Sequence, residues 1–138
     1  MAAHAIGYKV TRIAAEAGVD SIEHSYFISD DVLKMMVEKH IFLVPTDGTV
    51  KTFVDMSFGM YQPTETERAE REKEYVPWVA REQERLKRAI KAGVPIAAGS
   101  DMNVTMPAMT RGQASLLVYE AYAESGRTGA INRQAPIA

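Results

Sequence analysis

Pro95-Ile96-Ala97-Ala98-Gly99-Ser100-Asp101 is the stretch of sequence that decides the fold. A short apolar run that ends in Gly-Ser-Asp is typical of a buried parallel strand followed by a turn. The carboxylate of Asp101 then falls at the carboxyl end of that strand, where α/β proteins carry their chemistry. Two other strand-like runs also end in reactive side chains, Ala2-Ala3-His4 and Ser21-Ile22-Glu23-His24. The sequence therefore raises the question of whether these three strand ends share one site.

The composition favours one soluble globular domain. The chain has 138 residues, of which 46% are hydrophobic and 25% charged, and its net charge is −2. This charge gives no electrostatic reason to expect binding to nucleic acid or to an anionic membrane. The absence of cysteine excludes disulfides, thiolate metal ligands and a cysteine nucleophile. No run approaches about 20 apolar residues and the first ten do not resemble a signal peptide, so a cytoplasmic location is expected.

Helical patterns separate the expected strands. The first, over 9–17, has the i, i+3, i+4, i+7 spacing of an amphipathic helix and ends at Gly18; its expected inward residues are Val10, Ile13, Ala14 and Ala17. The second, over 31–39, follows the capping segment Ser29-Asp30-Asp31; its expected inward residues are Val32, Leu33, Met36 and Val37. A third buried strand is expected over 41–45.

The second half of the chain is less regular. Residues 47–63 are expected to be irregular, either an ordinary packing loop or a loop over a site. Thr64-Glu65-Thr66-Glu67 matches a capping box that opens a charged helix up to Ala92, with its charges as a solvated face. Pro77 should kink or split that helix near Val76. A last helix is expected over 113–125, followed by a loose tail over 126–138.

The order of elements predicts an α/β fold. Strands alternate with helices, which implies a parallel sheet with right-handed crossovers. The two joints Glu16-Ala17-Gly18-Val19 and Lys91-Ala92-Gly93-Val94 repeat weakly, and both lead from a helix into a strand. The pattern gives about four βα units over 1–125, which is half of a (β/α)8 TIM-type barrel.

The three strand ends could hold a metal ion. Adjacent strands lie ~4.8 Å apart, so two imidazoles on neighbouring strands can reach one ion. Two histidines and an aspartate are sufficient ligands for zinc, and the aspartate could accept a proton from water. Each residue also has an ordinary role open to it: His4 as a solvent-facing end, His24 as a hydrogen-bonded strand end and Asp101 as a turn cap. His40 falls at the opposite end of the sheet, after a helix.

Four segments together resemble the second half of the amidohydrolase superfamily, particularly its imidazolonepropionase-like and prolidase-like members. They are Ala2-Ala3-His4-Ala5, 17–24, 42–46 and 92–101. The resemblance implies strands five to eight of a (β/α)8 barrel with one or two metal ions, usually zinc, at its carboxyl rim. It implies that His4 and His24 are the metal ligands of strands five and six, and that Asp101 binds metal and acts as general acid and base. The reaction implied is hydrolysis of C–N bonds in small amides, cyclic amides or dipeptides.

The sequence also departs from that superfamily. The His-x-His pair of the first strand and the bridging lysine of the fourth have no counterpart, and Met106-Pro107-Ala108 lacks the histidine that often follows the aspartate. The sequence therefore predicts a truncated barrel. One alternative is a non-catalytic fragment that needs the missing half or self-association; another is a small open α/β domain that binds a ligand at its strand ends. Exposed sheet edges predict a homo-oligomer.

Overall fold

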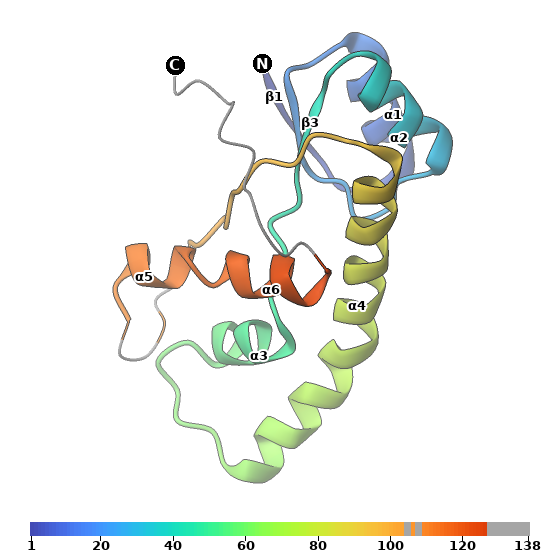
Figure 1. Cartoon of the computed structure of the whole chain (residues 1–138). Coiled ribbons are helices and arrows are strands. Elements are labelled where there is room, and N and C mark those ends of the chain that lie inside the picture. The colour runs from blue at the N-terminus through green and yellow to red at the C-terminus, as the bar shows by residue number, and fades with distance from the viewer. Residues whose placement is uncertain (104–105, 107–108, 127–138) are drawn as a thin grey trace.

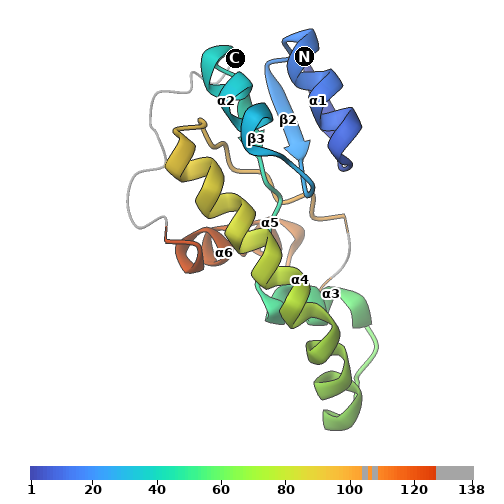
Figure 2. The same ribbon diagram turned by 90° about the vertical axis from the view of Figure 1, so that its right-hand side faces the viewer.

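A three-stranded parallel sheet forms the centre of the structure, a computed structural model that describes residues 1–103, 106 and 109–126. Its strands are β1 (Ala2–Ala5), β2 (Ser21–His24) and β3 (Phe42–Val44), in the order β1-β2-β3 (Figure 1). The crossovers contain α1 (Tyr8–Ala17) and α2 (Asp30–Glu38), which lie beside the sheet (Figure 2). The predicted α/β fold with parallel strands is confirmed. The assignment to barrel strands five to eight stays a prediction.

The predicted fourth strand at 95–101 is wrong beyond a single residue pair. Ile96 forms one parallel bridge with Leu43, whose N–H donates to the Pro95 carbonyl at 2.9 Å. The next residues, Ala97, Ala98 and Gly99, have low strand preference, and Ala98 is exposed. Gly99 is needed for close approach, because a Cβ there would lie 2.5 Å from a methyl carbon of Val44. This segment therefore follows the edge of β3 without extending the ladder.

The hydrophobic core lies between the sheet and the helices. Its fully buried side chains come from β2, β3, α2 and α4: Ile22, Leu43, Val32, Leu33, Met36 and Leu86. Burying each such side chain contributes about 1.5–3 kcal/mol. The predicted inward face of α2 is thereby confirmed for three of its four residues, while Val37 is only partly buried.

The predicted inward face of α1 is confirmed for Ala14 and wrong for Val10, Ile13 and Ala17, which are exposed. The buried residues are Thr11, Ala14 and Ala15. The hydroxyl of Thr11 donates to the Gly7 carbonyl, so its burial leaves no unpaired polar group. The small alanines let the helix backbone approach the sheet closely. The spacing of the larger apolar residues, on which the prediction was based, does not reveal this close approach. The predicted helix end at Gly18, with φ 71°, is confirmed.

The predicted irregular segment 47–63 contains a helix, α3 (Val50–Phe58). Its cap is Thr49, whose hydroxyl accepts a hydrogen bond from the N–H of Thr52 at 3.1 Å. The expectation of an irregular loop is therefore wrong at its centre. The segment 59–64 that follows has no helix or strand.

The long helix α4 (Glu65–Ala92) opens with the predicted capping box between Thr64 and Glu67. It is not split at Pro77, which lies inside it, because proline's fixed φ is helical and only one backbone hydrogen bond is lost. The expectation that its charges form a solvated face is wrong for Glu82 and Arg85, which are 2% and 3% exposed. The helix packs against α2, α3 and α6.

The predicted last helix over 113–125 is two helices, α5 (Arg111–Ser115) and α6 (Val118–Glu124), with a turn between them (Figure 1). A second capping box, between Thr110 and Gln113, opens α5. The predicted tail lies outside the described residues beyond Gly126. Across the described part of the chain, no helix is long and apolar enough to cross a membrane.

Candidate functional site

The three predicted site residues lie at one edge of the sheet. Nε2 of His24, the last residue of β2, is 2.9 Å from Nδ1 of His4 in β1. Oδ2 of Asp101 is 3.9 Å from the same Nε2 atom. His24 is buried, whereas His4 and the Asp101 carboxylate are exposed. His4 and His24 meet because the carboxyl ends of neighbouring parallel strands lie at one end of the sheet, whereas Asp101 comes from the segment that follows the single bridge at Ile96. His40 lies before β3, at the other end of the strands.

The Thr46 hydroxyl determines which nitrogen of His24 carries the proton. Its Oγ1 donates to the Pro45 carbonyl at 2.7 Å and lies 2.6 Å from Nδ1 of His24. A hydroxyl has only one proton, so the Nδ1–H of His24 donates to Thr46 and the lone pair of the neutral ring is on Nε2. That lone pair faces His4 and Asp101. The unprotonated Nε2 of His24 is therefore the acceptor in its 2.9 Å contact with Nδ1 of His4.

The environment of His24 favours its neutral form. Burial lowers the pKa of the His24 imidazole, and the positive charge of a protonated His4 lowers it further. The rings of the two histidines are 4.4 Å apart between centroids, in an edge-to-face arrangement. The hydroxyl of Tyr26 adds a contact of 3.3 Å to Nδ1 of His24. A neutral imidazole is the form that binds metal ions, so these surroundings suit ligation.

The backbone at this end of the sheet is left-handed at four positions that are not glycine. His24, Ser25, Thr46 and Asp101 have φ of 70°, 53°, 56° and 47°. Each costs on the order of 1–3 kcal/mol and persists only where surrounding contacts hold it. Two of the four are predicted site residues, and Thr46 bonds to His24. His40, at the other end of the strands, is also left-handed with φ 55°, so such strain is not confined to this end of the sheet.

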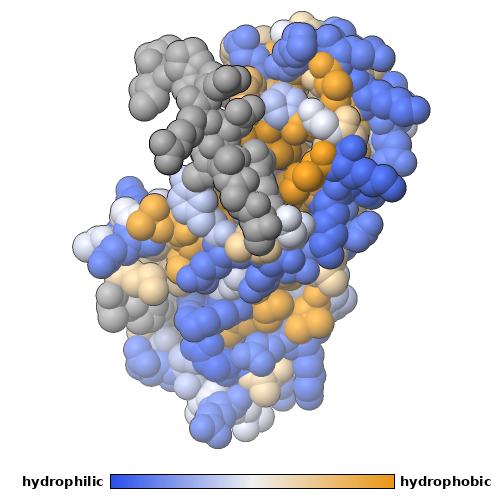
Figure 3. Space-filling model, in the orientation of Figure 1, coloured by the Kyte–Doolittle hydropathy of each residue, from blue (hydrophilic) through white to orange (hydrophobic). Residues whose placement is uncertain are grey.

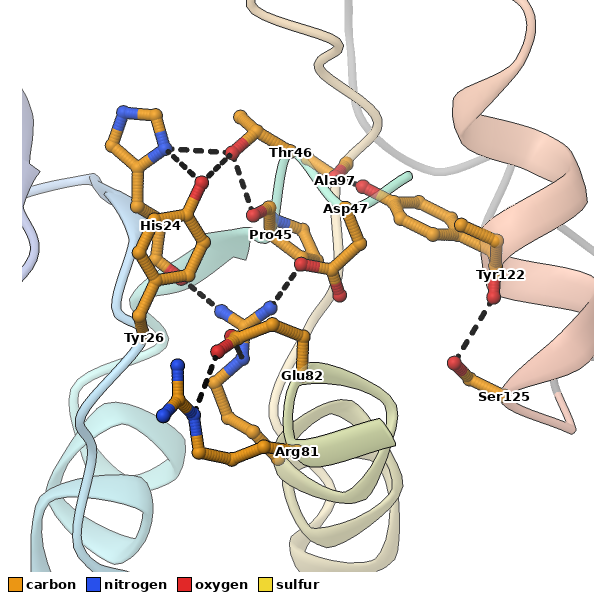
Figure 4. A network of polar contacts seen from close by, with 12 residues as sticks. His24, Tyr26, Pro45, Thr46, Asp47, Arg81, Glu82, Ala97, Tyr122 and Ser125 are labelled. Carbon is orange, nitrogen blue, oxygen red and sulfur yellow. Dashed lines mark hydrogen bonds and ion pairs between the residues drawn. The ribbon is translucent and has the colours of Figure 1, made fainter. Parts of the chain in front are cut away.

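A buried ionic network supports this edge from α4 (Figure 4). Arg85 donates to the carbonyl oxygen of His24 and to Oδ1 of Asp47, and its Nε is 3.2 Å from Oε2 of Glu82. Burial raises the pKa of Asp47 to about 7 and also raises the pKa of Glu82. Sequence reasoning missed Thr46, Tyr26 and this network. The only available signal was the position of Thr46 at a strand end, matching His24.

A cavity of about 110 Å³ adjoins the site. Polar groups of Thr46, Asp47 and Asp101 line one part of it, and apolar side chains line much of the rest: Tyr26, Phe53, Met56, Met102, Leu117 and Val118. Tyr26 and Phe53 both pack against Trp78, with centroid distances of 5.5 and 4.5 Å. Asp101 thus lines a small and largely apolar cavity, whereas neither His4 nor His24 is among its lining residues.

The donor set fits a metal ion in its chemistry but is incomplete. Two imidazole nitrogens face each other, and a carboxylate lies near one of them, which are ligand types that zinc accepts. Within residues 1–103, 106 and 109–126, no group of three or more His, Cys, Asp or Glu side chains is arranged to hold a metal ion. His4 and His24 are thus the two best-placed donors, and Asp101 stands further away.

No protein-family model and no curated protein sequence matches the chain. The chain is, however, similar to several solved structures. A Xaa-Pro dipeptidase with methionine bound in its active site is 26% identical, with a TM-score of 0.63 over 91% of this chain and 29% of that one. Ochratoxinase from A. niger is 29% identical, with a TM-score of 0.62 over 92% of this chain and 26% of that one. An uncharacterized protein, 22% identical with a TM-score of 0.59 over 90% and 28% of the two chains, shares the fold.

These similarities support a relationship to the amidohydrolase superfamily over part of the chain, as the sequence motifs indicated. The two structures with named activities, a dipeptidase and ochratoxinase, are hydrolases. Their similarity supports the resemblance of this chain to hydrolases. The chain spans less than a third of the length of the solved structures it matches.

Proposed function

We propose that this chain contributes to a metal-dependent hydrolase that cleaves C–N bonds in small amides, cyclic amides or dipeptides. The observation that carries the proposal is the convergence of His4 Nδ1, His24 Nε2 and Asp101 at one sheet edge beside a cavity. The similarity to a dipeptidase and to ochratoxinase supports the reaction class. In this proposal β1, β2 and β3 correspond to strands five to seven of a (β/α)8 barrel, and the segment 95–101, which has a single bridge at Ile96, corresponds to strand eight.

His4 and His24 would hold the metal ion, with Asp101 as a further ligand, and zinc suits this donor set. When bound, zinc supplies Lewis acidity, which makes water nucleophilic at neutral pH. Thr46 contributes by holding the proton of His24 on Nδ1, so that Nε2 stays a donor. Asp101 accepts a proton from the attacking water on Oδ2 and delivers it to the leaving nitrogen as the C–N bond breaks. No side chain of this site is required as a nucleophile.

The adjoining cavity favours a substrate with a small apolar group. Its volume is about 110 Å³, and the aromatic and aliphatic side chains named above form much of its wall. Asp101 and Thr46 are among its polar lining residues. A substrate with its scissile bond near Asp101 could place an apolar group against Tyr26 and Phe53.

The test is zinc retention by the purified chain. After dialysis from a zinc buffer, we expect sub-stoichiometric zinc in the wild type and loss of most of it in His24→Ala. His40→Ala is the matched control, because His40 is exposed and lies at the other end of the sheet. A zinc-loaded sample should also release amine from Xaa-Pro dipeptides or N-acyl amino acids. Zinc retention that is the same in His24→Ala and the wild type would show that the site is wrongly assigned.

A second candidate function is a non-catalytic module that acts through association. Among the described residues the outer edge of β1 has no strand partner, and the chain that follows β1 exposes four apolar side chains, Ile6, Tyr8, Val10 and Ile13. Figure 3 also shows apolar surface, in orange, in the upper part of one face, where the sheet lies. We expect homo-oligomers in sedimentation experiments. Zinc binding without hydrolysis, by an oligomer, would favour this module over the enzyme.

A further inference from the structure

We propose that Arg85 is a positioning residue that holds His24 and Thr46 in the arrangement that directs Nε2 of His24 into the site. The inference deepens the proposed function and rests on it for metal affinity, but not for the orientation of the imidazole. Arg85 comes from α4, more than sixty positions along the chain from His24. The two residues are brought together only by tertiary structure.

The guanidinium of Arg85 contacts every segment that fixes the His24 ring. One terminal nitrogen donates to the backbone carbonyl of His24, and the other donates to the carboxylate of Asp47, the residue after Thr46. Its central carbon lies 5.4 Å from the ring centroid of Tyr26, which is within cation–π range. Its side chain is 3% exposed, so these contacts are made away from water. One planar group thus joins the ends of both strands, β2 and β3, behind the imidazole.

These contacts act where the backbone is strained. His24 and Thr46 are both left-handed, and such residues revert unless their neighbours hold them. Arg85 bonds directly to the carbonyl of the first and to the residue that follows the second. The rigid fork of arginine can bridge two acceptors at a fixed angle, whereas the point charge of lysine cannot. Loss of the fork should free the His24 ring from Thr46.

The network is costly as a purely structural element. Burying an arginine with two carboxylates requires several kcal/mol of desolvation per ion, and apolar residues of the same size often stabilise a fold as well or better. Within the described residues Asp47 Oδ2 has no hydrogen-bond partner, and Glu82 Oε2 and Arg85 Nε form an ion pair at 3.2 Å but no hydrogen bond. Burial raises the pKa of Asp47 to about 7, which reflects the same cost. A role in positioning His24 accounts for a buried cation at this place.

The experiment compares Arg85→Met and Arg85→Lys with Arg88→Met in the complete chain. Arg88 lies one turn further along α4 and pairs with the exposed Asp30, so it is a matched control. The first readout is the tautomer of each histidine, from ring ¹⁵N shifts at about pH 8, where imidazoles are neutral. The chain has only three histidines, and His40 serves as an internal reference. The second readout is the Zn²⁺ dissociation constant, by competition with a chelator.

We expect the wild type and Arg88→Met to show His24 as the Nδ1–H tautomer. Both Arg85 variants should show a mixture of tautomers and about 10–100-fold weaker zinc binding, as for loss of other outer contacts of metal ligands. If the wild type binds no zinc but the tautomer still changes, the proposed function fails and this inference stands. A folded Arg85→Met or Arg85→Lys variant with the wild-type tautomer would overturn it. Unfolding of both variants would also overturn it, because Arg85 would then be a structural residue.

Discussion

Nδ1 of His24 and Oγ1 of Thr46 lie 2.6 Å apart, and the Thr46 hydroxyl donates its own proton to the carbonyl oxygen of Pro45. These two contacts decide which nitrogen of the imidazole carries the proton and which carries the lone pair. The available nitrogen is the one that faces His4 and Asp101. The chemistry of the site therefore depends on a hydroxyl group that is not itself among the predicted ligands.

Thr46→Val should remove the hydrogen bond that keeps the proton of His24 on Nδ1. Valine has the shape of threonine and keeps the β-branched side chain at the same left-handed position, but it has no acceptor for the Nδ1–H of His24. We expect zinc affinity to fall about 10–100-fold, measured by competition with a chelator. Thr46→Ser, which keeps the hydroxyl, should recover most of it.

Thr66→Val is the control for this substitution, because Thr66 is exposed in the first turn of α4. It should leave zinc affinity unchanged. Equal zinc affinity in Thr46→Val and the wild type would mean that the hydroxyl has no part in orienting His24.

Gly99→Ala should displace the segment that leads to Asp101. A Cβ at this position would lie 2.5 Å from Cγ1 of Val44, and the rigid edge of β3 offers little room. We expect a loss of about 1–3 kcal/mol in the free energy of unfolding, which is typical of overpacking. Urea unfolding followed by circular dichroism measures it.

Gly112→Ala is the matched control. A Cβ there meets no atom within 4 Å, and Gly112 lies in α5. Alanine in a helix should stabilise the chain by about 0.5–1 kcal/mol. Gly99→Ala with the same stability as the wild type would show that the segment after α4 can move away from β3 at no cost.

Pro77→Ala should stabilise α4. Proline inside a helix removes one backbone hydrogen bond and costs about 3 kcal/mol relative to alanine. Pro77 is exposed, so alanine loses no packing there. We expect a higher melting temperature and more helical signal, with Val76→Ala at the exposed neighbouring position as the control for a change in surface side chain. A lower melting temperature would show that Pro77 contributes a contact of its own.

The sequence predicted the parallel sheet and the proximity of His4 and His24, because both follow from chain order, whereas Asp101 comes close to His24 without the fourth strand that was predicted to place it. Parallel strands joined by helical crossovers must bring their carboxyl ends to one edge. Gly18 and the capping box at Thr64 were also predictable, since these signals act within a few residues of the chain. Local and topological rules therefore recovered the sheet, two element boundaries and the proximity of the two histidines, while their role in a site stays a prediction.

The supporting contacts could not be predicted in the same way. Arg85 and Glu82 lie in a helix so rich in charge that periodicity offers no reason to separate them from their exposed neighbours. Their burial depends on where α4 crosses the ends of β2 and β3. The face of α1 was missed for a related reason: small residues permit close packing, and Ile13 remains exposed beside the edge strand β1. Such outcomes depend on distances between elements, which a sequence pattern does not contain.

The buried Asp47 carboxyl should make stability fall as the pH rises from about 4 to 7. Its pKa is raised from 3.8 to about 7 by burial, although the Arg85 charge opposes the rise. Between these values the folded chain binds a proton that the unfolded chain releases, so the stabilisation from the protonated form is lost as pH approaches the folded pKa. Asp47→Asn does not titrate. The free energy of unfolding of the wild type should therefore fall relative to that of Asp47→Asn as the pH rises, by up to about 4 kcal/mol, at 1.36 kcal/mol per pKa unit.

Asp55→Asn gives a control of opposite sign. Burial raises the pKa of Asp55, but its ion pairs with Lys51 and Arg68 outweigh this and leave it lowered. The ionised Asp55 stabilises the folded chain above the unfolded pKa of about 4, and this stabilisation is lost only under more acidic conditions. The difference in free energy of unfolding between the wild type and Asp55→Asn should therefore be constant from about pH 5 to 8. Urea unfolding across this range measures both differences. The prediction is contradicted if the free energy of unfolding of the wild type stays constant or rises relative to that of Asp47→Asn as the pH rises. Arg85 would then keep Asp47 ionised at every pH tested.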